Sequence, residues 1–190
     1  MKTASGVAFA LLFIGLANSH AASPFKKVSG DELLHTPSSV LFPPKVSVFT
    51  RGDTDVFRSN PRDVSVRYFL DAFILCDVSV YAVGIYGNDL NEEFQIQQNA
   101  IRQLSKNVKL LSKESRRMTR SGHVVNGVHA TYELQRDLFG TRNRKCGSEI
   151  FVFRDGPWFV AYRFSYPRER LDIAHQHVAA FVEQWHWRER

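Results

Sequence analysis

The chain has 190 residues, a formal net charge of +6 at pH 7, 44% hydrophobic residues and 13% aromatic residues. This composition excludes an intrinsically disordered chain, which is poor in apolar and aromatic residues. The length predicts one domain with a sizeable core. The positive charge is unevenly spread, because 11 bases stand against three acids between Arg102 and Lys145.

The N-terminus has the features of a secretory signal peptide. An unbroken apolar run, Val7–Ala17, follows a short positive start. The run is too short for a transmembrane helix, which needs about 20 apolar residues. Ser19 and Ala21 are the small side chains expected before a cleavage site. We therefore expect residues 1–21 to be removed, no membrane span to remain, and the mature protein to be exported to a periplasm or secreted.

Residues 22–44 are rich in proline and serine and show little apolar periodicity, which predicts an extended lead-in arm with one short helical turn near Asp31. The single folded domain is expected over residues 45–190. Arg51-Gly52-Asp53 predicts a turn; the tripeptide also matches an integrin-binding motif, but Gly-Asp is ordinary turn chemistry. Strands are expected near residues 45–48, 56–57 and 64–69.

The stretch Phe73–Ile85 predicts the central strand of the sheet. Cys76, Val78, Val80 and Ala82 share one face of such a strand, and Asp77, Ser79 and Tyr81 share the other.

The hydrophobic period then changes to that of a helix. Leu90, Phe94 and Ile101 fall on one stripe of a helix that ends near Asn107. Asp89 with Glu92 resembles a capping box at its start.

Four strands and a closing helix are predicted in the rest of the chain. A strand over 108–115 leads into a basic connection at 116–122, and strict alternation predicts a strand over 128–135. Strands at 149–154 and 158–166 are joined through Asp155-Gly156, a hairpin signal. Pro167 precedes the last helix. This order indicates an α+β fold, a mostly antiparallel sheet with two main helices packed on it as an α/β sandwich.

Two local patterns resemble the PsbP/DcrB-like superfamily of small α+β sandwich proteins. Asn126-Gly127-Val128-His129-Ala130-Thr131-Tyr132 is similar to the strand entry of that family, and Phe153-Arg154-Asp155-Gly156 with the following strand, proline and helix is similar to its ending. The resemblance covers roughly the latter half of the chain. It implies a non-enzymatic accessory or binding protein, and it carries no catalytic residue onto this sequence.

Cys76 and Cys146 are the two cysteines of the chain. In an exported protein an even pair favours a disulfide bond, so we expect a bridge between them. The alternative is a pair of buried free thiols, because free cysteine packs as a small hydrophobe.

The basic middle segment supplies the candidate binding residues. We expect them to engage an envelope protein or an anionic polymer, with solvated surface charge as the alternative. His123 and His129 lie close in sequence to Arg116, Arg117 and Arg120 and could help form an anion site, with solvated loop residues as the alternative. The full set of candidates is Arg116, Arg117, Arg120, His123, Arg142, Arg144 and Lys145.

No catalytic, cofactor or metal motif is present in the sequence. His175 and His177 point to different faces of the predicted helix, so no metal site is expected. The leading hypothesis is a non-enzymatic binding protein of the cell envelope. An envelope hydrolase stays open, because paired carboxylates converge in space rather than along the chain. Extracellular nucleic-acid binding fits the basic charge but lacks interleaved aromatic residues.

Overall fold

The computed structural model describes residues 23–185 apart from 72, 106 and 121. The predicted signal peptide, residues 1–21, lies outside the described residues. No helix in the described part is long and apolar enough to cross a membrane.

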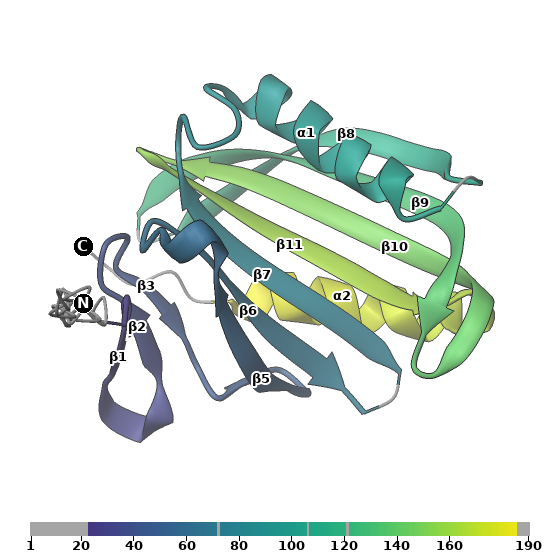
Figure 1. Ribbon diagram of the computed structural model, residues 1–190, viewed down its shortest axis with the longest axis horizontal. Coiled ribbons are helices and arrows are strands. Elements are labelled where there is room, and N and C mark those ends of the chain that lie inside the picture. Colours follow the sequence, from purple (N-terminus) through teal and green to yellow (C-terminus); the bar gives the residue numbers. More distant parts are fainter. Residues whose placement is uncertain (1–22, 72, 106, 121, 186–190) are drawn as a thin grey trace, which may run out of the picture.

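The main element is one eight-stranded sheet in which every neighbouring pair is antiparallel (Figure 1). Its order is β4-β5-β6-β7-β11-β10-β9-β8. The strands are β4 (Lys45–Val46), β5 (Phe49–Val56), β6 (Asp63–Leu70), β7 (Ile74–Ala82), β8 (Lys109–Arg120), β9 (His123–Leu138), β10 (Thr141–Asp155) and β11 (Trp158–Pro167). With two helices, this confirms the predicted α+β class with a mostly antiparallel sheet.

Helix α1 (Leu90–Gln103) packs on one face of the sheet, over β9 and β10. The Asp89 side chain accepts hydrogen bonds from the backbone N–H groups of Asn91 and Glu92 at its start. Glu92 in turn accepts from the backbone N–H of Asn88, one residue earlier than in a standard capping box. Phe94 is fully buried against the sheet, as the predicted stripe requires.

Helix α2 (Leu171–Gln184) packs on the opposite face, where Val178 and Phe181 are buried among the aromatic side chains of β5, β6 and β11. A short 3₁₀ turn, Arg168–Arg170, lies between Pro167 and this helix. Helices therefore pack on the sheet from both sides, α1 over β9 and β10 and α2 over β11. Cys76, Val78, Val80 and Ala82 of β7 all face the α2 side, as predicted, and Tyr81 faces the α1 side.

The expected lead-in arm forms a small sheet of its own. Its strands are β1 (Phe25–Lys27), β2 (Leu33–His35) and β3 (Val40–Phe42), in that order. A 3₁₀ turn at Ser29–Asp31 lies where a helical turn was expected. Phe42 is fully buried, with its ring edge-on to Trp185 at 5.6 Å. Regular structure thus begins well before Lys45, because residues of this segment belong to the main core.

Two predicted turns differ from the structure. Arg51-Gly52-Asp53 lies within β5, at a break in register between Arg51 and Thr54, rather than in a turn. The β10–β11 hairpin is present, but Asp155 pairs with Trp158 and the loop is Gly156-Pro157. Gly156 has a φ of 59° and proline fixes a negative φ, which is the pattern of a type II′ turn.

The predicted disulfide between Cys76 and Cys146 is wrong for this fold, in which both thiols are free and buried. Cys76 lies on β7 and Cys146 on β10, with β11 between them, a separation of roughly 9–10 Å across the strands alone. The register places them opposite Phe164 and Pro167 of β11, an odd offset that puts the two thiols on opposite faces. Bridged cysteines need Cα atoms within about 7 Å.

We predict that the protein unfolded without reductant has two alkylatable thiols per chain. Burial raises the pKa of both thiols, so neither reacts readily while the protein is folded. Intact mass after alkylation in denaturant, with and without prior reduction, measures the count. Alkylation that requires reduction would contradict this arrangement.

His35 attaches the small sheet to the main domain. Its Nε2 donates to the Pro61 carbonyl at 2.7 Å, its Nδ1 lies 2.6 Å from Ser38 Oγ, and its ring stands edge-on to Trp158. Burial lowers the pKa of His35 from its ordinary value of 6.5, because it removes the charged ring from solvent, and the hydrogen bond to the Pro61 carbonyl opposes this shift only in part.

We predict that the free energy of unfolding falls as the pH drops below 6.5, because the unfolded chain protonates His35 before the folded protein does. The contribution is complete above that pH and is lost as the pH falls toward the lowered pKa. Urea unfolding across this pH range measures the slope. His35→Gln should flatten it, whereas His177→Gln on α2 should not; an unchanged slope in His35→Gln would contradict the assignment.

Candidate functional site

Strand β8 forms one edge of the main sheet. It pairs only with β9, and it is 12 residues long, whereas the opposite edge strand, β4, has two. Residues 109–117 of β8 are exposed except at their pairing edge with β9. An edge strand of this length presents a row of backbone N–H and C=O groups that no strand of the sheet pairs.

The structure brings four of the seven predicted binding residues together at one end of the β8–β9 hairpin. Arg116, Arg117 and Arg120 belong to β8 itself, which continues through the segment expected to be a connection, and His123 pairs with Arg120 at the start of β9. These four residues are the hairpin bases. His123 Nε2 lies 3.1 Å from Asp155 Oδ1.

The other three predicted residues, Arg142, Arg144 and Lys145, lie at the start of β10 and are the β10 bases. Asn126 of β9 pairs with Arg117 of β8 on one side and with Arg154 of β10 on the other. Arg154 is therefore the β10 residue that lies beside the hairpin bases. Arg144 stands ten residues earlier on that strand, roughly 33 Å away. It forms an ion pair with Glu169. The predicted basic region is therefore two separate groups.

A cavity of about 370 Å³ lies between α2 and strands β8, β9 and β10. Arg116, Arg117 and Met118 border it from β8. Half of the residues that line it are apolar, namely Met118, Phe151, Phe153, Val178, Ala179 and Val182, and the other half are charged residues and histidines, Glu183 of α2 among them. The volume is within the range of ordinary ligand pockets.

The floor of the cavity is a buried carboxylate, Glu149, whose side chain is 3% exposed. Its Oε1 accepts from the Tyr166 hydroxyl at 3.0 Å and lies 2.8 Å from His175 Nδ1. Its Oε2 lies 2.9 Å from His129 Nε2. Burial, followed by the nearby Glu149 charge, raises the pKa of Tyr166 well above its ordinary range, so this hydroxyl keeps its proton as a donor.

His129 connects this floor to the strand edge. Its ring is stacked on Phe151, with centroids 4.0 Å apart, and its Nδ1 lies 3.0 Å from Glu114 Oε1. Glu114 also pairs with Arg116 at 2.9 Å. The hydrogen bond from His129, with Arg116 second, lowers the pKa of Glu114. Both ring nitrogens of His129 therefore face carboxylates.

Glu149 and His175 were not predicted, although the sequence carries a signal for each. Glu149 occupies the same face of its strand as Phe151 and Phe153, where a carboxylate is out of place. His175 precedes Val178 and Val182 by three and seven residues, on one stripe of α2. No three metal-ligating side chains converge on a metal position anywhere in the described residues.

The fold and this edge define a class: a small antiparallel α+β domain with one open, basic strand. No family model and no curated protein matches the chain. Among solved structures it is similar to cyanobacterial PsbP (CyanoP) from Synechocystis sp. PCC 6803, with 13% identity over 92% of this chain and 99% of that one and a TM-score of 0.49.

It is also similar to PA94, a protein of unknown function from Pseudomonas aeruginosa. The identity is 14%, over 70% of this chain and 93% of that one, with a TM-score of 0.40. Both are likenesses of structure at low sequence identity, and the resemblance to the PsbP/DcrB-like superfamily stays a prediction.

Proposed function

We propose that this is an exported, non-enzymatic binding protein of the cell envelope that holds an extended, acidic segment of a protein partner along β8. The observation that carries the proposal is the 12-residue edge strand with a cavity running beside it, under α2. Export follows from the predicted signal peptide.

Strand addition suits this geometry because β8 offers both features that it uses, an exposed strand edge and a neighbouring cavity. Backbone hydrogen bonds to an exposed edge supply affinity, and pockets for alternate side chains supply specificity. An incoming strand next to β8 alternates its side chains between the two faces of the sheet. Those on the α2 side lie over the cavity bordered by Arg116 and Met118, whose apolar lining residues suit an apolar side chain.

The charge of β8 favours an acidic partner over a second copy of the chain. Lys109, Lys113, Arg116 and Arg117 are exposed on the strand, and Glu114 is its one acid. Two such edges repel each other, which is a known protection against edge-to-edge pairing. The same charges attract an acidic segment and speed its association.

The polar groups of the cavity support binding rather than hydrolysis. Both Glu149 oxygens already face donors from Tyr166, His175 and His129. A carboxylate held in this way is not free to take a proton from a substrate or a water. Nucleic-acid binding is also less well supported, because β8 carries no aromatic side chain for base stacking.

The proposal predicts that a synthetic strand of alternating glutamate and valine binds the mature protein and that its lysine counterpart does not. Fluorescence anisotropy measures both, and the affinity should fall with added salt. Two N-methylated peptides test the pairing, one methylated at its odd-numbered amides and one at its even-numbered amides. Only one of the two sets points toward β8, so one peptide should lose binding and the other should keep it.

Charge reversal locates the interaction. Arg116→Glu with Arg117→Glu should weaken the acidic peptide about tenfold or more, since each exposed pair contributes up to about 1 kcal/mol and reversal adds repulsion. The matched control, Arg142→Glu with Lys145→Glu, changes the same charge among the β10 bases and should leave binding unchanged. Equal losses of affinity in the two charge-reversed variants would contradict strand addition at β8. So would unchanged binding of both N-methylated peptides.

A further inference from the structure

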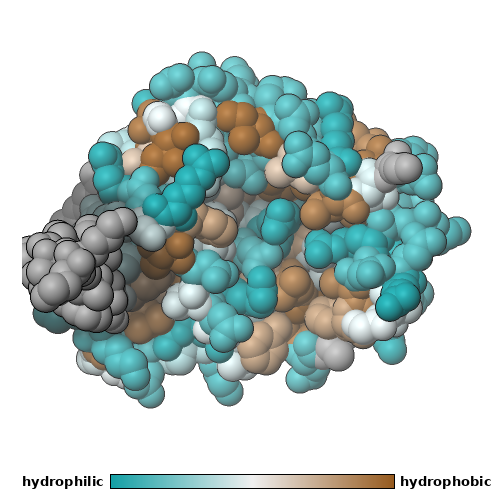
Figure 2. All heavy atoms as spheres, viewed as in Figure 1, coloured by the Kyte–Doolittle hydropathy of each residue, from teal (hydrophilic) through white to brown (hydrophobic). Residues whose placement is uncertain are grey.

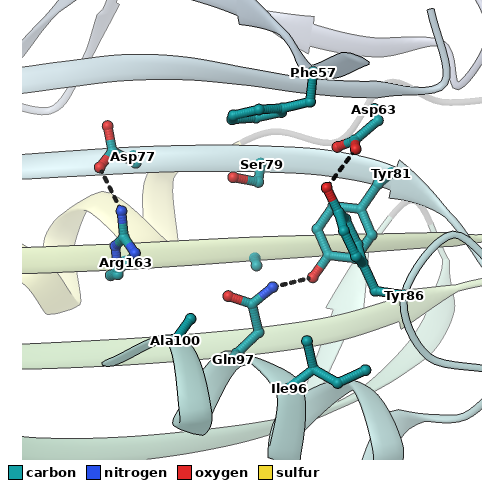
Figure 3. A pocket seen from close by; sticks show the side chains of 11 residues that line it. Phe57, Asp63, Asp77, Ser79, Tyr81, Tyr86, Ile96, Gln97, Ala100 and Arg163 are labelled. Carbon is teal, nitrogen blue, oxygen red and sulfur yellow. Dashed lines mark hydrogen bonds and ion pairs between the residues drawn. The ribbon is translucent and has the colours of Figure 1, made fainter. Parts of the chain in front are cut away.

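A second cavity, of about 320 Å³, lies on the opposite face of the sheet between α1 and the strands that this helix leaves uncovered (Figure 3). Its floor is formed by β6, β7 and β11. The space-filling view shows polar and apolar side chains mixed across this face, with a hollow toward its middle (Figure 2). We call this cavity the slot. It is separate from the β8 edge.

The register explains why the sheet is hollow there. Three rows of side chains cross the slot floor: Asp63 and Tyr81, then Ser65, Ser79 and Ala161, then Arg67, Asp77 and Arg163. Successive rows are two residues apart, so the outer rows are separated by roughly 14 Å of strand. The middle row has only small side chains, and the space above it is the slot.

One end of the slot is acidic and aromatic. Asp63 is 2% exposed, and its Oδ2 accepts from the Tyr86 hydroxyl at 2.5 Å. The Tyr86 ring stands edge-on to Tyr81, whose hydroxyl donates to the buried Glu93 at 2.7 Å. Phe57 lies across this end from the tyrosines (Figure 3). A carboxylate among aromatic rings is the environment that ammonium groups favour.

Burial is the main reason that the pKa of Asp63 is raised, with the Tyr86 hydrogen bond and Arg58 opposing it. The carboxylate therefore lacks a full set of charge-stabilising partners. A bound cation would supply the one that is missing.

The other end of the slot is basic. Asp77 is shared by two guanidinium groups, with Arg67 Nε at 3.1 Å and Arg163 at 3.2 Å. One carboxylate cannot neutralise both, so this end carries an excess positive charge. Arg163 lines the slot and is one-third exposed. Guanidinium groups bind carboxylates with good geometry.

The floor of the slot's middle is formed by small, uncharged side chains, Ser65, Ser79 and Ala161. Ile96 and Ala100 of α1 line the slot above this floor. An acidic end, a small uncharged middle and a basic end fit a molecule with the complementary order of groups.

We propose that the slot binds a small zwitterion whose ammonium lies beside Asp63, whose carboxylate lies beside Arg163, and whose aliphatic chain crosses the small middle row. The α-ammonium and α-carboxylate of an amino acid are attached to the same carbon. They are too close together to reach both Asp63 and Arg163, so the spacing of the rows excludes a ligand that binds through these two groups alone. The class of ligand is an ω-amino carboxylate or a lysine-like side chain with a free carboxylate.

Isothermal titration of the mature protein with 6-aminohexanoate tests this, with hexanoate, hexylamine and glycine as comparison ligands. We expect 6-aminohexanoate to bind at least tenfold more tightly than each of the others. Equal affinity for 6-aminohexanoate and hexylamine, or no binding of 6-aminohexanoate, would overturn the proposal.

Two variants assign the ends. Asp63→Asn should remove the advantage of 6-aminohexanoate over hexanoate, and Arg163→Gln should remove its advantage over hexylamine. Ala100→Leu fills the middle of the slot from the helix side without touching either charged end, so it should abolish binding even if a charge variant folds poorly. Full binding by folded Ala100→Leu would show that the ligand lies elsewhere.

Discussion

The two 14-residue helices cover only part of the eight-stranded sheet, and both candidate sites lie where a helix leaves strands uncovered. Seven strand spacings amount to roughly 34 Å, whereas one helix is about 10–12 Å wide. α1 lies over β9 and β10, which leaves the same face of β6, β7 and β11 open as the slot. α2 borders, on the other face, the cavity next to β8. The edge of β8 itself is left without a neighbouring strand.

The parts of the fold that follow from local patterns could be predicted from the sequence. Alternation along β7 assigned Cys76 and Val78 to one face, and the side chain of Asp89 set the start of α1. The β10–β11 hairpin was expected from its glycine. These features depend on residues a few positions apart, so period and turn chemistry specify them.

The pairings between distant strands could not be predicted in this way. The offset of three residues that puts Cys76 and Cys146 on opposite faces exists only once β7 and β10 both pair with β11. The same applies to the hairpin bases and the β10 bases, which are near in sequence but lie at opposite ends of long antiparallel strands. The slot likewise forms because Ser79 and Ala161, 82 positions apart, fall in one row. A register of this kind is a property of the whole sheet.

The central claim is that β8 accepts a further strand, and amide hydrogen exchange on the mature protein tests it most directly. With a saturating acidic strand peptide, the account predicts slower exchange at alternate amides of residues 109–119, the ones that point away from β9, with little change in β5 at the opposite side of the sheet. Unchanged exchange along β8, or protection confined to the opposite edge, would contradict it.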